Sequence, residues 1–220
     1  KLAGARASRM TICSMTKAET YPEIRDAIRK LCGRFPGQYW RALDRERAYP
    51  TDFVKALTEA GWLSVLIPEP YGGAGLGIGA ACAVLEEIHR SGANGAACHA
   101  QMYTMGTLLR HGSEAQKETW LPKIASGEIR LQAFGVTEPT SGTDTTRIQT
   151  FAKKVGDTYV VNGSKIWISR AEHSDLMILL CRTSPRDEAG KASDGMSVLL
   201  VDMREAKGNG LTIKPVRTML

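Results

Sequence analysis

The chain has 220 residues, of which 43% are hydrophobic, so it can bury the core of one large domain or of two ordinary ones. Its net charge of +6 comes entirely from residues 1–50, which hold eleven Lys and Arg against five Asp and Glu, whereas the rest of the chain holds eighteen of each. The longest clean apolar run covers residues 176–181, far short of the roughly 18 residues that a membrane span needs, so we expect no membrane association.

The basic excess and the cysteines indicate no specialised class of protein. A nucleic-acid binder would interleave basic and aromatic side chains on one face, whereas residues 1–50 are typical of a solvated basic helical surface, so we expect no nucleic-acid partner. The five cysteines are odd in number, far apart and without a C-x-x-C pair, and the four histidines lack ligand spacing. These patterns favour a reducing compartment and indicate no metal site.

The first residues of the chain leave its cellular location open. Residues 1–18 contain four basic residues and no acidic one, as a transit peptide does. Met10 and Met15 equally resemble alternative starts preceded by residues foreign to the protein, and we favour this second interpretation. We treat residues 1–19 as a flexible N-terminal segment and expect the cytoplasm for a bacterial source or the mitochondrial matrix for a eukaryotic one.

Helical periodicity runs through residues 20–127. Thr20 and Glu23 have the spacing of a capping box, and Ser113 and Gln116 repeat it before a later helix, which we expect to stop before Pro122. Glycines follow most of the apolar stretches, as is usual at helix ends. The first predicted helix ends near Gly33. The others cover residues 39–48, 51–61, 80–91, 96–111 and 113–121, and a last short one ends at 126–127.

A glycine-rich stretch inside this helical region resembles a dinucleotide-binding fingerprint. Gly75-x-Gly77-x-x-Ala80 matches G-x-G-x-x-G/A, but that motif requires a strand before it, a second parallel strand and an acidic residue about twenty positions on. Residues 93–101 contain no acid, and the pattern that follows is again helical. We therefore interpret the stretch as a plain loop.

From Arg130 the hydrophobic period changes from 3.6 to 2, which predicts strands. Gly156-Asp157 and Asn162-Gly163 are expected hairpin turns, and no long helix intervenes, which favours an antiparallel sandwich or barrel. The fold class is therefore α+β, with a helical domain at 20–127 and a β domain at 128–220. The predicted strands are residues 131–137, 149–155, 159–161, 165–169, 176–181, 196–201 and 211–214.

Two stretches of the β domain carry the polar and aromatic groups that suit a ligand. The turn of residues 137–144 offers hydroxyls and backbone amides, and Gly142 permits the close approach of an anion. The predicted strand at 165–169 places Trp167 and Ser169 on one face and the two isoleucines on the other. The alternative is an ordinary Ser/Thr-rich turn beside a core tryptophan. No nucleophile with a base is found, and Glu86-Glu87 is interpreted as a solvated helix face.

Four motifs, in order, resemble the acyl-CoA dehydrogenase family over nearly the whole chain. Two lie in the helical region and at its junction with the sheet, and two are similar to the flavin-binding segments of the family. The motifs are Ile67-Pro-Glu-Pro-Tyr-Gly-Gly-Ala-Gly-Leu-Gly77, His111-Gly-Ser-Glu-Ala-Gln-Lys117 with Trp120-Leu-Pro-Lys-Ile-Ala-Ser-Gly-Glu128, Gly135-Val-Thr-Glu-Pro-Thr-Ser-Gly-Thr-Asp144, and Asn162-Gly-x-Lys-x-Trp-Ile-Ser169. Thr140-Ser141 stand where Gly-Ala is common in the family.

The resemblance implies that FAD lies across the β domain. The flavin ring would lie near Phe134, Val136 and Thr137, with Trp167 packed beside it. Ile168 and Ser169 would lie close to its reactive N5 edge. The pyrophosphate would lie at Gly142 and Thr143, and Thr143 is also a candidate substrate contact.

The resemblance further implies α,β-dehydrogenation of an acyl-CoA thioester to the trans-2-enoyl-CoA, with electrons passed on to an electron-transfer flavoprotein and assembly as a homo-oligomer. Family members continue into a C-terminal four-helix bundle that provides the glutamate base, so we expect no catalytic residue within this chain. The alternatives are a non-enzymatic module that binds flavin or a partner, and an oxidase or monooxygenase of the same superfamily. The acyl group is not indicated.

Overall fold

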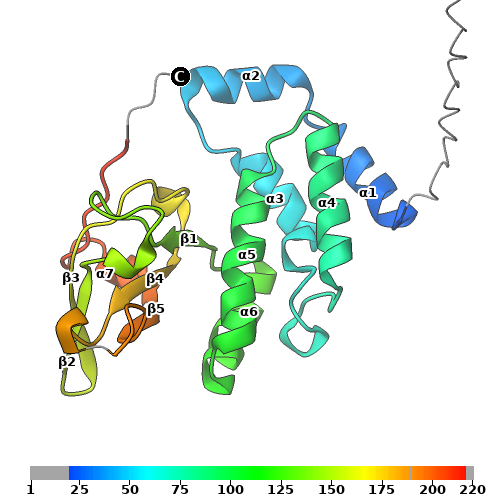
Figure 1. The fold of residues 1–220 in the computed structure, drawn as a ribbon. Helices are drawn as coiled ribbons and strands as arrows, with labels where there is room; N and C mark the ends of the chain where they lie inside the picture. Colours follow the sequence, from blue (N-terminus) through cyan, green and yellow to red (C-terminus); the bar gives the residue numbers. More distant parts are fainter. Residues whose placement is uncertain (1–19, 189, 217–220) are drawn as a thin grey trace, which may run out of the picture.

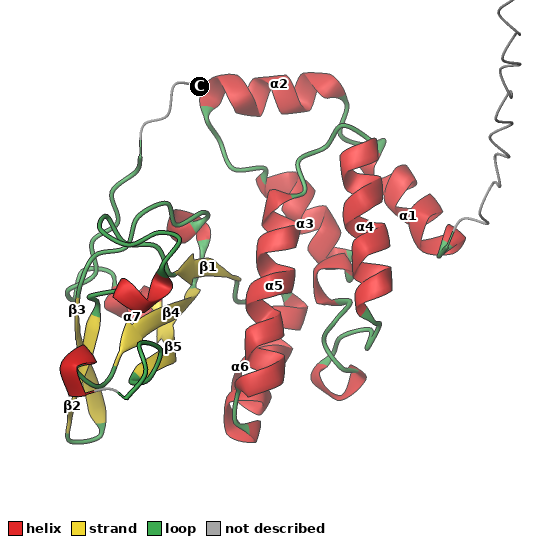
Figure 2. Ribbon diagram, in the orientation of Figure 1, coloured by secondary structure: helices red, strands yellow, loops and turns green. Residues whose placement is uncertain are grey.

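The computed structural model describes residues 20–188 and 190–216 and places a helical part beside a sheet, as Figures 1 and 2 show. The predicted segment at 1–19 lies outside the described residues. The helical part comprises α1 (Pro22–Cys32), α2 (Gly37–Glu46), α3 (Thr51–Glu59), α4 (Ile78–Arg90), α5 (Ala96–His111) and α6 (Glu114–Ser126). The second part comprises β1 (Leu131–Gly135), β2 (Phe151–Val155), β3 (Thr158–Asn162), β4 (Leu176–Arg182) and β5 (Met196–Asp202), followed by α7 (Met203–Ala206).

Helix positions follow the sequence patterns, with two corrections at their ends. The capping box of Ser113 and Gln116 is present, whereas α1 has Tyr21 as its N-cap without a side-chain hydrogen bond, and the carbonyl of Thr20 instead accepts from Arg25. Helix α6 also continues through Pro122, where we predicted a break. The buried side chains of Leu121 and Ile124 on either side of the proline hold this turn against the core despite the lost backbone hydrogen bond.

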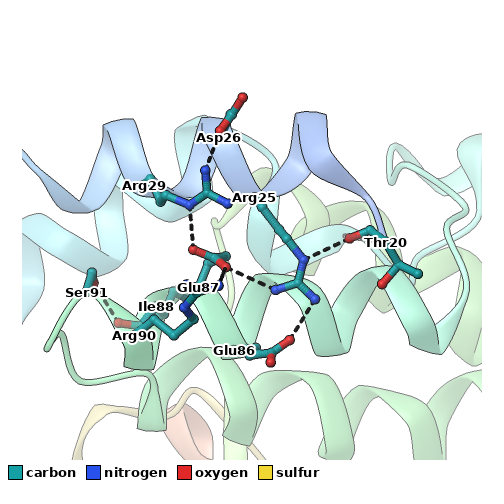
Figure 3. A network of polar contacts seen from close by, with 9 residues as sticks. All are labelled: Thr20, Arg25, Asp26, Arg29, Glu86, Glu87, Ile88, Arg90 and Ser91. Carbon is teal, nitrogen blue, oxygen red and sulfur yellow. Dashed lines mark hydrogen bonds and ion pairs between the residues drawn. The ribbon is translucent and has the colours of Figure 1, made fainter. Parts of the chain in front are cut away.

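Helix α1 is attached to α4 by a cluster of charged side chains (Figure 3). The carboxylate of Glu87, 1% exposed, accepts from Arg25 at 3.0 Å, from Arg29 at 2.8 Å and from Arg90 at 2.9 Å. Burial alone would raise the pKa of Glu87, but the hydrogen bonds from Arg29 and Arg25 outweigh it and lower the pKa. The predicted solvated face at Glu86-Glu87 is therefore correct only for Glu86, whose side chain is 59% exposed.

The glycine-rich stretch is a loop, as predicted, and Gly73 just before the motif has a packing role. No strand precedes it, since residues 62–64 form a 3-10 turn. A Cβ at Gly73 would lie 2.0 Å from the carbonyl oxygen of Ile67, so only glycine allows the two backbones this approach.

The helical domain followed by a β domain is confirmed, but the sheet is mixed rather than purely antiparallel. Strand β4 pairs in parallel with β1 and, at Phe151 and Arg182, with β2, while the pairs β2–β3 and β4–β5 are antiparallel. Parallel neighbours need a long connection, which is usually a helix. Here the β2–β3 hairpin and its flanking loops make that connection, so the absence of a helix was a misleading signal.

Three predicted β features are wrong in detail. Residues 165–169 are not a strand, and of residues 211–214 only Leu211 forms a bridge. The predicted turn at Gly156-Asp157 is confirmed and closes the β2–β3 hairpin, with Gly156 in the left-handed region at φ 61°. The second predicted hairpin, at Asn162-Gly163, does not form, because residues 163–170 are not a strand. A Cβ at Gly163 would lie 2.7 Å from the Cα of Thr150, so this glycine serves a close approach of two segments.

The hydrophobic core runs from the helices into the sheet. One cluster contains Met105 of α5, Leu121 of α6, Leu131 of β1 and Ile178 of β4. The hydroxyl of Thr104 donates to the carbonyl of Leu131 at 2.6 Å across the same contact. Among the described helices, none is long and apolar enough to cross a bilayer.

Candidate functional site

The two stretches selected from the sequence lie side by side. The amide of Ile166 donates to the carbonyl of Thr137 at 2.9 Å, and the Lys165 ammonium donates to the carbonyl of Val136 at the same distance. The end of β1 and the segment that follows β3 therefore form one surface, as they must if both motifs bind the same ligand.

A buried ion pair fixes this junction, and sequence reasoning did not find it. The Lys165 ammonium lies 2.9 Å from a carboxylate oxygen of Glu138, and the two side chains are 9% and 4% exposed. The same carboxylate accepts from the amides of Gln149 and Thr150 at 2.6 and 2.9 Å. Burial alone would raise the pKa of Glu138, but hydrogen bonds from the side chain of Thr150, the amide of Gln149, the Lys165 ammonium and the amide of Thr150 lower it to about 2. Both residues lie in the quoted motifs, but nothing local predicts that they pair.

The turn after Glu138 is shaped by one buried hydroxyl. Ser141, 6% exposed, exchanges backbone hydrogen bonds with Glu138, and its Oγ donates to the carbonyl of Asp144 at 2.6 Å. The side chain of Asp144 accepts from the hydroxyl and the amide of Thr146, which lowers the pKa of Asp144. Serine in place of the common alanine thus makes the turn's own hydrogen bond.

Gly142 and Thr143 form the open part of this turn. Both are exposed, and within residues 20–188 and 190–216 their amides donate no hydrogen bond to the chain. A Cβ at Gly142 would have no neighbour within 4 Å, and its φ is not positive, so neither packing nor backbone conformation requires a glycine. Two adjacent backbone amides without hydrogen-bond partners can bind an anionic group, and the missing side chain of Gly142 lets that group approach closely.

Trp167 presents its indole to solvent from a strained backbone. Its φ is 62°, in the left-handed region that bulky residues rarely adopt, and it is 64% exposed. Its neighbour Ile168 packs inward against the cluster that contains Ala133 and Met177, whereas Ser169 is exposed. The predicted alternation is therefore confirmed in burial, although the segment is not a strand.

The side of the site toward the helices is aromatic. Phe134 is 38% exposed at the end of β1, and its ring centroid lies 5.9 Å from that of Tyr103 on α5. Tyr103 is also 38% exposed and tilts against His99 at 5.1 Å. The sequence analysis did not select Tyr103.

A buried arginine holds the loops next to the turn, and it too escaped sequence reasoning. The Arg182 guanidinium, at the end of β4, donates to the carbonyls of Thr146, Ile148, Ala192 and Asp194 at 2.6 to 3.2 Å. It therefore ties residues 146–148, which follow the turn, to the loop before β5. An arginine at the end of an apolar run looks like an ordinary solvated strand end, so no signal pointed to this role.

These features fit a cofactor with a flat aromatic ring and an anionic arm. Exposed ring faces at Phe134 and Trp167 suit the ring, and the open amides of Gly142 and Thr143 suit a phosphate. Thr137 and Ser169 have hydroxyls without a hydrogen bond to the described chain. The assignment of each residue to a part of FAD, and of Thr143 to the substrate, stays a prediction.

The chain matches two family models that together cover most of its length. The model for the N-terminal domain of acyl-CoA dehydrogenases matches residues 18–128, and the model for their middle domain matches residues 133–220. A glutaryl-CoA dehydrogenase from Desulfococcus multivorans is 36% identical over 192 residues, which are 84% of this chain and 47% of that protein. A mitochondrial isovaleryl-CoA dehydrogenase from Pongo abelii is 33% identical over 190 residues, 84% of this chain and 44% of that protein.

Solved structures show the same likeness. An acyl-CoA dehydrogenase from Geobacillus kaustophilus matches with a TM-score of 0.77 and 29% identity, over 86% of this chain and 49% of that one. A structure described as the electron transferring flavoprotein of Acidaminococcus fermentans matches with a TM-score of 0.73 and 27% identity, over 82% and 47% of the two chains. The chain thus spans about half the length of the curated relatives it matches.

Proposed function

Because the chain belongs to the acyl-CoA dehydrogenase family, whose members are FAD-dependent flavoproteins, we propose that it supplies the flavin-binding part of an enzyme that dehydrogenates an acyl-CoA thioester. The observation that carries this proposal is the exposed, left-handed Trp167 beside a turn with two unpaired amides. A tryptophan that only fills the core would be buried. An ordinary Ser/Thr-rich turn would need no exposed aromatic side chain beside it.

Each residue of the site has a role that its chemistry can fill. Trp167 and Phe134 would pack on the ring, and Val136 and Ile168 would exclude water from it. Thr137 and Ser169 would donate hydrogen bonds to its polar edge, and the amides of Gly142 and Thr143 would bind the pyrophosphate. When bound, FAD supplies the acceptor for the hydride that leaves the β carbon of the acyl chain.

The proton on the α carbon requires a base, and Glu138 is unsuited to that task. It is the buried carboxylate of the turn, but its ion pair with Lys165 and its pKa of about 2 make it a very weak base at neutral pH. We therefore place the base outside these 220 residues. The relatives differ in their acyl group, glutaryl and isovaleryl, so the proposal names only the acyl-CoA class.

The likeness to a structure described as an electron transferring flavoprotein supports a flavoprotein of that kind as the electron acceptor. Assembly as a homo-oligomer is part of the same proposal and follows from the family resemblance alone. Size measurement of the purified protein in solution tests it.

The test uses the complete protein that contains this chain. We expect it to purify with FAD, identified after release by chromatography, and to reduce an artificial dye when an acyl-CoA is added. Trp167→Ala should weaken FAD binding at least tenfold because the ring loses its packing surface, a loss of about 1.4 kcal/mol or more. Tyr159→Ala, which removes an aromatic side chain that is 44% exposed on β3, is the matched control and should bind FAD normally.

Other outcomes separate the alternatives. Bound flavin without dye reduction by any acyl-CoA would favour a non-enzymatic binding module. Substrate-dependent oxygen consumption at a rate matching dye reduction would favour an oxidase or monooxygenase. A protein that binds no flavin at all would overturn the proposal.

A further inference from the structure

One side chain of the helical part contacts both segments that flank the candidate site. Tyr49 lies between α2 and α3. Its ring stacks on the imidazole of His173 with centroids 4.3 Å apart and an angle of 26°, and the guanidinium of Arg170 lies 5.7 Å from the same ring. Its hydroxyl donates to the side-chain oxygen of Gln132 at 3.0 Å.

These partners adjoin the residues proposed to hold the flavin. Arg170 follows Ser169 directly and has a φ of 64°, so it forms the bend that leads from Trp167 into the 3-10 turn of Ala171–His173. Gln132 lies two residues before Phe134 on β1 and is fully buried. Tyr49 therefore bridges the bend after Trp167 and the strand that carries Phe134.

The β1 end of this bridge is rigid. The hydroxyl of Ser174, next to His173, accepts from the amides of Gln132 and Ala133 at 2.8 and 3.1 Å and so fills the irregularity in the β1–β4 pairing. The Gln132 side chain in turn contacts that of Gln101 on α5 at 3.5 Å. On the side of the sheet, Ile168 and Ala171 on either side of the bend pack against the cluster that contains Ala133, and the amide of His173 donates to the carbonyl of Arg170 at 3.1 Å. From the side of the helical part, the Tyr49 ring contacts the bend itself.

We propose that Tyr49 is a positioning residue of the flavin site, which sets the orientation of Trp167 and Ser169 by holding the bend at Arg170 against β1. The inference rests on the proposed function, since it names the flavin as the group that these residues face. Stacking and the cation–π contact hold the bend, and the hydrogen bond to Gln132 fixes the ring. Tyr49 would touch neither cofactor nor substrate.

The test compares two tyrosines of the helical part in the complete, flavin-loaded protein. Tyr49→Leu removes the stack and the hydrogen bond. Tyr39→Leu is the matched control, because Tyr39 packs on Phe35 and Trp40 in the helical core and contacts neither flanking segment. Both should lower the melting temperature. Only Tyr49→Leu should change the visible circular dichroism of the bound flavin and speed its dissociation about fivefold or more.

Arg170→Gln gives a second variant that leaves the helical core intact. It should reproduce the spectral change in part, and Tyr49→Phe, which keeps the stack, should fall between Tyr49→Leu and the wild type. If Tyr49→Leu and Arg170→Gln leave the flavin spectrum and dissociation rate as Tyr39→Leu does, the positioning role is overturned while the proposed function stands. A wild-type protein without flavin would overturn both.

Discussion

Protonation of Glu138 should control the acid stability of the site. An ordinary glutamate titrates near 4.5, whereas the folded protein holds the pKa of Glu138 at about 2. Above pH 4.5 the carboxylate is ionised in both states and contributes fully to folding, roughly 3 kcal/mol. As pH falls from 4.5 to 2, the unfolded chain takes up a proton that the native state refuses, so this contribution is lost. Urea unfolding across this range measures it.

Substitution separates this carboxylate from the others. Glu138→Gln should cost about 3–5 kcal/mol at pH 7, because it leaves the Lys165 ammonium buried without its partner, and the remaining loss of stability below pH 4.5 should be smaller. Glu138→Gln with Lys165→Met should recover part of the cost. Glu46→Gln, on the exposed surface of α2, is the control and should change neither value. Equal acid sensitivity in Glu138→Gln and wild type would contradict the assignment.

For single residues, the sequence predicts whether a side chain is exposed better than it predicts which side chain it pairs with. Alternating character placed Trp167 outward and Ile168 inward, and both are so placed. The predicted strand at 165–169 is wrong because the left-handed conformation of Trp167 interrupts the pleat. No neighbouring residue in the sequence indicates this conformation. The pairing of Glu138 with Lys165 joins positions 27 residues apart, so only the folded backbone determines it.

The attachment of α1 to α4 should depend on a single carboxylate. Glu87 is buried and accepts from Arg25, Arg29 and Arg90, so Glu87→Gln removes the negative charge from among three guanidinium groups. Loss of a buried ionic partner costs about 3–5 kcal/mol. We expect the amides of α1 to exchange hydrogen with solvent much faster than those of α5.

The adjacent Glu86 provides the control for this prediction. It contacts the same Arg25 at 2.6 Å, but its side chain is 59% exposed, and exposed ion pairs contribute little. Glu86→Gln should therefore leave exchange in α1 nearly unchanged. Similar exchange in the two variants would show that burial of Glu87 is not what holds the helix.

Helices were predictable here because their signals are local. The bounds of α5 match the prediction, and the Ser113 cap and the left-handed Gly127 delimit α6. Sheet pairing depends instead on contacts between distant segments, such as Leu131 with Leu176. The same distance explains why the parallel β1–β4 pair was missed while the β2–β3 hairpin was found.

The whole molecule should unfold as one unit, although two family models divide it. The predicted boundary at residue 128 falls between α6 and β1, but the core cluster with Met105, Leu121, Leu131 and Ile178 crosses it. The two parts therefore share buried side chains in this cluster, in addition to the cluster that each part forms from its own residues. The boundary itself stays a prediction.

Leu131→Ala tests this coupling at the centre of the shared cluster. Leu131 is 0% exposed, so its truncation leaves a cavity that should cost about 2–5 kcal/mol. Because the cavity adjoins α5, α6 and β4, protection against hydrogen exchange should fall by the same factor in the helical and β parts. Val198→Ala, 50% exposed on β5, should change neither part measurably. If only β1 and β4 lost protection while α5 and α6 kept theirs, the two parts would be independently stable, and the contact through Tyr49 would then be a docking of two folded domains.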